Sequence, residues 1–163
     1  MISSHLRIAG GLLVALAFSA GSALVLRQTN ASEEDTAAVK QVVAAYDAAF
    51  NQHDAHAVGA LFAEDGDFTN MRGSSKHGRS DIEQNYGNLF NGGLKASHRT
   101  DAVKSVRLLN PGMAQVDATW EMTGTKAADG SENPTRKGLL NWLVAKVDGQ
   151  WRIVIFHESE FPK

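Results

Sequence analysis

The spacing of apolar positions predicts helices in the first half of the chain and strands in the second. From about Asp35 to Asn51, apolar residues recur every three or four positions, which predicts a helix with one buried face. Asp54 can cap a short second helix, which a turn at Asp65-Gly66 is expected to end. A third helix is expected to begin at a capping box formed by Ser80 and Glu83, and its buried face continues to Phe90.

The period changes from about 3.6 to 2 in the C-terminal half. Between Met113 and Thr125, apolar side chains alternate with polar ones, which predicts a half-exposed strand. Other strands are expected over His98 to Leu109, Arg136 to Val147 and Trp151 to Glu158, after a short strand that starts at Phe68. Four consecutive strands favour an antiparallel sheet. The sequence therefore predicts an α+β domain in which three N-terminal helices cover one face of a curved antiparallel sheet.

The first 31 residues form a separate segment. No charged residue occurs from Ile8 to Leu26, and small residues follow this stretch, which is typical of a signal peptide cleaved before Ser32. The alternative is an uncleaved membrane anchor, because the stretch approaches the roughly 20 residues needed to cross a bilayer. We therefore expect a signal peptide over 1–31, one domain over 32–163, and a periplasmic or secreted protein that meets the membrane only if the segment is retained.

Composition narrows the functional classes. The 163-residue chain has 16 basic and 18 acidic side chains, so no excess of positive charge invites nucleic acid. It has no cysteine, which excludes disulfides and thiolate chemistry. No dinucleotide-binding fingerprint is present, and we expect no cofactor.

Three short motifs together resemble a known superfamily. They are Leu61 to Phe68 (LFAEDGDF), Gly78 to Ile82 (GRSDI), and Gly149 to Ile153 (GQWRI) followed by His157. Their order and spacing resemble the nuclear transport factor 2-like superfamily, which has a cystatin-like fold, and within it the SnoaL-like and SgcJ/EcaC-type bacterial proteins. The resemblance implies a cone-shaped domain with a pocket between sheet and helices, which often dimerises through its sheet. Fold alone does not decide function, because the superfamily includes enzymes as well as binding and assembly domains.

Ketosteroid isomerase chemistry is argued against by one residue. The catalytic base of those enzymes follows the Leu-x-Ala-x-Asp stretch, and the corresponding position here is Asn70. An amide cannot accept the proton, so Asn70 is expected to contact a ligand and not to act as a base.

His157 is the candidate catalytic residue, because it lies near the end of the last strand and imidazole exchanges protons near neutral pH. The alternative is a hydrogen-bonded structural histidine. A two-residue Asp148-Gly149 turn would pair His157 with Leu140, whereas a three-residue loop would pair it with Asn141. The expected ligand-binding set combines these polar groups with the aromatic side chains that could line a cavity: Tyr46, Phe50, Phe68, Asn70, Tyr86, Trp120, Asn141, Trp142 and His157.

Two further polar clusters have simpler structural interpretations. His53 and His56 flank Asp54, but nothing nearby completes a metal-ligand set, so no metal site is expected. The segment from Met71 to Arg79 could meet an acidic ligand at the rim of the pocket, although a solvated loop is the commoner explanation.

Two functions are compatible with the sequence. The first is an exported protein that binds, or acts weakly on, an apolar or aromatic small molecule. The second is a homodimerisation or assembly module with a vestigial cavity. A homodimer through the face that carries Thr119, Glu121 and Thr123 is expected in either case. Polar groups buried at the cavity end of the last strand would favour the first function, and a wholly apolar, filled interior would favour the second.

Overall fold

The structure is a computed structural model that describes residues 18–127 and 129–162, with side chains from residue 32 onward. The helices are α1 (Phe18–Asn51), α2 (Ala55–Ala60) and α3 (Arg79–Asn91). The strands are β1 (Phe62–Thr69), β2 (Ser75–His77), β3 (His98–Asn110), β4 (Met113–Thr123), β5 (Arg136–Val147) and β6 (Gln150–Glu160). Within these residues, no helix is long and apolar enough to cross a bilayer. Most of the segment predicted as signal peptide lies outside the described residues.

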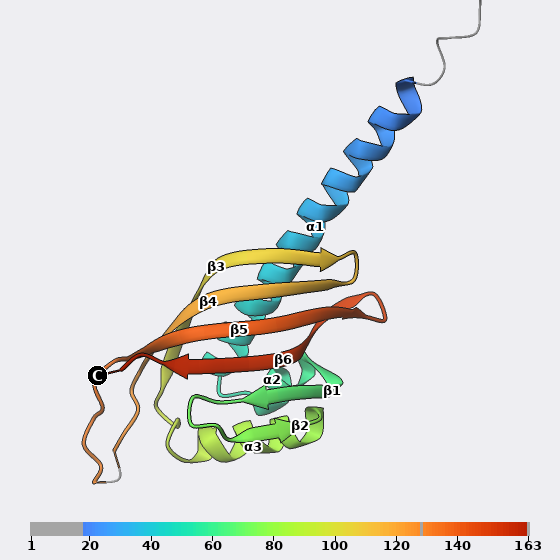
Figure 1. The fold of residues 1–163 in the computed structure, drawn as a ribbon. Helices are drawn as coiled ribbons and strands as arrows, with labels where there is room; N and C mark the ends of the chain where they lie inside the picture. The colour runs from blue at the N-terminus through green and yellow to red at the C-terminus, as the bar shows by residue number, and fades with distance from the viewer. Residues whose placement is uncertain (1–17, 128, 163) are drawn as a thin grey trace, which may run out of the picture.

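Six strands form one curved sheet in the order β2-β1-β6-β5-β4-β3. The helices lie on one side of this sheet, and the N-terminal part of α1 projects away from it (Figure 1). The predicted α+β architecture is confirmed. The sheet is not wholly antiparallel, because β1 runs parallel to β6.

The core forms where the inward residues of the helices meet the even-numbered residues of β4. In α1 the buried residues begin at Val39 and follow one helical face to Phe50. In β4 the alternate residues from Ala114 to Met122 are buried, because successive side chains of a strand point to opposite faces. Gly138 on β5 leaves space for the Trp120 indole, whose Nε1 donates to the Ser159 carbonyl at 3.1 Å.

Several local predictions were wrong at the boundaries. Asp65-Gly66 does not end a helix but lies within β1, in the stretch between Phe62 and Asp67 where the pairing with β6 shifts register. The predicted Ser80–Glu83 capping box is absent; Gly78 occupies the N-cap position with φ 82° and no side-chain cap bond. The expected loop from Met71 to Arg79 contains β2, which pairs with β1 at the edge of the sheet.

Candidate functional site

A cavity of about 220 Å³ lies between the helices and the inner face of the sheet. We call it the inner cavity. Its lining comes from two helices, five strands and the loops between them: Tyr46, Phe50, Phe68, Asn70, Met71, Arg72, Tyr86, Leu89, Gly93, Leu94, Arg99, Met122, Thr125, Lys126, Asn133, Arg136 and Glu158. About half of these residues are aromatic or aliphatic, and most of the others are polar or charged. Small-molecule sites combine apolar walls with polar groups that orient the ligand.

Two tyrosines place their hydroxyl groups together at this cavity. Tyr46 on α1 and Tyr86 on α3 are both buried, and their hydroxyl oxygens are 2.7 Å apart. Burial raises the pKa of both phenols well above the usual value, because the phenolate would be poorly solvated. The pair therefore stays neutral. One proton joins the two oxygens, and the other remains available to a ligand acceptor.

A buried arginine lies beside the tyrosines. Arg99 on β3 is 1% exposed, and its guanidinium carbon lies 5.3 Å from the Tyr46 ring centroid and 5.2 Å from that of Trp120. Two of its nitrogens make ion pairs, from Nε to Asp101 Oδ1 at 2.9 Å and from Nη1 to Glu158 Oε2 at 3.0 Å. The third, Nη2, has no hydrogen-bond partner among the described residues. A buried donor without a partner is costly, so Nη2 is a candidate ligand contact.

Three carboxyl groups, those of Asp47, Asp101 and Glu158, lie near Arg99. Burial raises the pKa of Asp101 to about 7, against the lowering effect of Arg99, and the negative charge of Asp47 raises it further. Burial likewise raises the pKa of Asp47, whose Oδ2 accepts the Asp101 backbone N–H at 3.0 Å. One guanidinium cannot compensate three nearby carboxylates in a buried site. We therefore expect this cluster to retain a proton near neutral pH.

Asn70 shapes one edge of the cavity. It lies in the turn between β1 and β2, where its Oδ1 accepts the backbone N–H groups of Arg72 at 2.9 Å and Ser74 at 3.0 Å. Gly73 follows with φ 76°, a conformation that glycine adopts readily. The Asn70 amide thus orders the turn and sets the position of Arg72.

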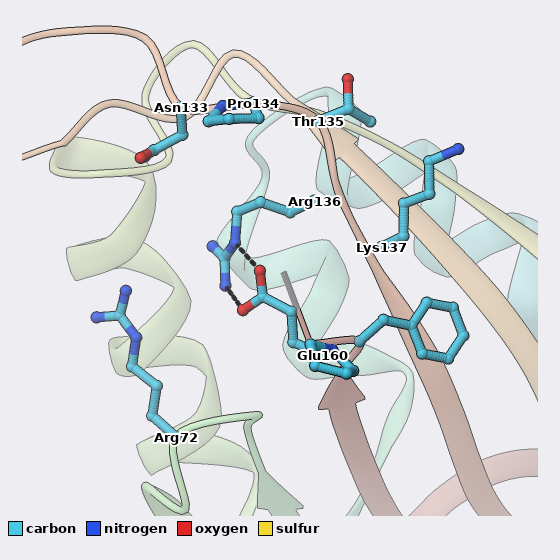
Figure 2. Close-up of a pocket in the computed structure, with 9 residues that line it drawn as sticks. Arg72, Asn133, Pro134, Thr135, Arg136, Lys137 and Glu160 are labelled. Atoms are coloured by element: carbon cyan, nitrogen blue, oxygen red, sulfur yellow. Dashed lines mark hydrogen bonds and ion pairs between the residues drawn. The ribbon is translucent and has the colours of Figure 1, made fainter.

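A larger cavity of about 490 Å³ adjoins the first, and we call it the outer cavity. The two share Arg72, Asn133 and Arg136 in their linings. Arg136 donates to Glu160 through two contacts, of 2.8 and 2.7 Å, and Figure 2 shows Arg72 to one side of this pair. The outer cavity therefore leads toward the inner one past a row of charged side chains.

Comparison with known proteins identifies the family. A family model described as a SnoaL-like domain matches residues 31–157. The chain belongs to this family. A search of curated proteins finds no match.

Solved structures agree with the SnoaL-like fold. An uncharacterised protein with a cystatin-like fold from Caulobacter vibrioides is 23% identical, with a TM-score of 0.72 over 79% of this chain and 91% of that one. A ketosteroid isomerase-like protein from Erwinia carotovora atroseptica is 21% identical, with a TM-score of 0.68 over 80% and 98%. An NTF-2 like protein of unknown function from Shewanella oneidensis is 20% identical, with a TM-score of 0.64 over 77% and 98%. At these identities the likeness shows the fold alone.

Five of the predicted ligand-binding residues line the inner cavity of the SnoaL-like domain: Tyr46, Phe50, Phe68, Asn70 and Tyr86. Trp120 and Trp142 are almost fully buried, but they are core residues and do not line it. The Trp120 ring packs against the guanidinium of Arg99, and Arg99 in turn lines the cavity.

His157 and Asn141 are not at the inner cavity, which corrects their expected position. Both side chains are exposed on the outer face of the sheet, where the Asn141 amide donates to Asp117 Oδ1 at 2.7 Å. His157 pairs with Asn141 although the turn has only two residues. The register shifts by one residue at Val154, between the pairs Leu143–Ile155 and Val144–Ile153, and this bulge resolves the two alternatives.

Arg99 and Glu158 are the residues that the sequence prediction missed. A signal was available, since Arg99, Asp101 and Val103 alternate along β3 and so share one face of the strand. Val103 packs against the core, which places the other two toward the interior. The inward position of Arg99 and Asp101 was not predicted, because charged residues in strands usually face solvent.

The histidines near α2 have structural partners. His53 Nε2 lies 2.9 Å from the Leu94 carbonyl oxygen, and His56 Nδ1 lies 3.2 Å from Glu83. Asp54 caps α2 as predicted, by accepting the Ala57 N–H at 2.9 Å. Among the residues that the structure describes, no three acidic or histidine side chains gather as a metal site.

Proposed function

We propose that this SnoaL-like protein is exported and binds a small, largely apolar or aromatic molecule in the inner cavity. The observation that carries the proposal is the buried guanidinium of Arg99 in the cavity wall, where Tyr46 and Tyr86 also lie with paired hydroxyls and where Arg99 Nη2 has no hydrogen-bond partner among the described residues. These donors suit a carbonyl or another acceptor oxygen on the ligand. An interior that holds ionised and hydroxyl groups favours a ligand pocket over a vestigial cavity.

Binding is better supported than catalysis. Glu158 is the one carboxylate among the described lining residues of the inner cavity, and it is held in an ion pair with Arg99. The two tyrosines stay protonated, so they can donate a hydrogen bond but cannot serve as bases. Asn70, at the position of the isomerase base, is an amide engaged with its own turn.

Export and homodimerisation are further parts of the proposal. The uncharged stretch from Ile8 to Leu26 supports export to the periplasm or beyond. The outer face of the sheet supports dimerisation, because Leu139 is 41% exposed there next to the polar pair Asp117 and Asn141. Light scattering of the purified protein at high micromolar concentration tests the dimer, and a monomeric mass would contradict it.

A variant that fills the cavity tests the binding function. Leu89 lines the inner cavity, so Leu89→Trp should occupy part of its volume and weaken a bound molecule. Leu109→Trp is the matched control, because Leu109 is 46% exposed and lines neither cavity.

The experiment measures binding of 2-naphthamide, a neutral aromatic amide, by titration calorimetry, after native mass spectrometry has checked for a retained small molecule. Wild type and Leu109→Trp should bind alike, and Leu89→Trp should bind at least several-fold more weakly. Equal binding by all three proteins would place the ligand elsewhere and overturn the proposal.

A further inference from the structure

Two positive side chains at the inner cavity, those of Arg72 and Lys126, form no ion pair and no side-chain hydrogen bond among residues 32–127 and 129–162. The turn that Asn70 orders holds Arg72, while Lys126 follows β4 and bridges by its backbone to Glu132. Both side chains therefore reach the inner cavity from loops.

The other cations of the two cavities are already paired. Arg99 is held by Asp101 and Glu158, Arg136 by Glu160, and Lys137 by Glu121 at 2.8 Å. These pairs account for both carboxylates that line the cavities. Arg72 and Lys126 are thus the two lining cations that no ion pair holds among the described residues, and both are exposed.

The arrangement separates charge from apolar surface. Figure 2 shows Arg72 beside the Arg136–Glu160 pair, with no contact to either side chain. Phe50, Phe68 and Leu89 form part of the apolar wall of the inner cavity. A ligand that fits this arrangement has an apolar body inside and a negative group at the opening, where an arginine fork can bind a carboxylate with two parallel hydrogen bonds.

We propose that the ligand is an amphipathic anion, an aromatic or aliphatic carboxylic acid whose carboxylate is bound by Arg72 and Lys126. This inference rests on the proposed binding function and specifies its ligand class. The carboxylate is bound at the opening and not at Arg99, because that guanidinium already has ion pairs with Glu158 and Asp101, and a further carboxylate would add negative charge to a cluster with more acids than bases. Arg99 Nη2 and the tyrosine hydroxyls remain available for a neutral acceptor on the apolar body.

The test compares two probes of nearly equal shape, 2-naphthoate and 2-naphthamide, of which only the first is charged. We expect wild type to bind the anion about fivefold more tightly, which is what two partly exposed ion pairs supply. The preference should shrink with added salt, because exposed charges are screened.

The variant Arg72→Gln/Lys126→Gln should lose the preference and bind 2-naphthoate no more tightly than 2-naphthamide. The matched control is Lys40→Gln/Lys104→Gln, which removes two exposed positive charges that line neither cavity. This control should keep the preference.

Each other outcome overturns the inference in a distinguishable way. If wild type binds both probes equally, or if Arg72→Gln/Lys126→Gln keeps the preference, the anion site is wrong while the binding function stands. If wild type binds neither probe, the binding function fails together with the anion site.

Discussion

Replacement of Arg99 by methionine tests the buried charge cluster at the inner cavity. The guanidinium makes two charge-assisted hydrogen bonds and packs against the rings of Tyr46 and Trp120. Methionine keeps much of the apolar contact but removes the charge that compensates Asp101 and Glu158, whose side chains are 0% and 7% exposed. Leaving buried carboxylates without their partner costs about 3–5 kcal/mol of unfolding free energy.

The cost should depend on pH, and its sign follows from the pKa of Asp101. This pKa is raised to about 7 in the folded protein, so the protonated form is favoured by folding. The stability that this group contributes is present at low pH and is lost as the pH rises through about 7. Arg99 is the main cause that lowers this pKa, so the pKa of Asp101 should be still higher in the Arg99→Met variant.

The assay is urea unfolding followed by tryptophan fluorescence, at about pH 5 and about pH 8. We expect Arg99→Met to lose about 3–5 kcal/mol at the higher pH and less than about half of that at the lower pH. Arg107→Met on the same strand is the control, because Arg107 is exposed and bonded to Gln115, so little stability should be lost. An equal loss at both pH values would refute the proposed coupling between Arg99 and its acids.

Three other predictions concern single side chains. Tyr46→Phe removes the hydroxyl bonded to Tyr86, so 2-naphthamide should bind about fivefold more weakly in calorimetry while the fold survives, and unchanged affinity would contradict a role in binding. Gly138→Ala would place a Cβ 2.7 Å from the Trp120 indole and 1.8 Å from a backbone oxygen, so unfolding should show a loss of at least about 1–3 kcal/mol, and wild-type stability would contradict this packing. His157→Ala should leave 2-naphthamide affinity unchanged, because the imidazole is exposed on the outer face, and weaker binding would return His157 to the site.

Helical and strand periodicity in the sequence predicted most of the fold. The buried face of α3 contains Ile82, Tyr86 and Phe90, as their spacing indicated. The alternation in β4 predicted which side chains face the core. Such patterns depend on neighbouring residues of one element, so they can be read without knowledge of the rest of the chain.

The errors arose where distant segments pair. Asp65-Gly66 has the composition of a turn, but it lies inside β1, between Phe62 and Asp67, which both pair with the C-terminal strand β6. The position of His157 depends on the bulge at Val154, which no local pattern marked. A one-residue shift of register turns every side chain to the other face, so His157 was placed on the wrong side.

The aromatic part of the candidate site could be predicted from sequence, but its charged part could not. Tyr46, Phe50 and Tyr86 face the cavity because they belong to the apolar faces of α1 and α3. The burial of Arg99 depends on partners from β3 and β6, Asp101 and Glu158, and on three rings that surround it. Those contacts form only when the sheet packs against the helices, so no pattern within one element reveals them.

A titration followed by nuclear magnetic resonance maps where a ligand binds, residue by residue. Isotope-labelled protein is titrated with 2-naphthamide, and the backbone amide shifts are followed by nuclear magnetic resonance. We predict that the shifted amides surround the inner cavity, at Asn70 to Arg72, at Gly93 and Leu94, and at Met122 to Thr125. Shifts confined to the outer face of the sheet, around Asp117, Asn141 and His157, would contradict the central claim that the inner cavity is the binding site.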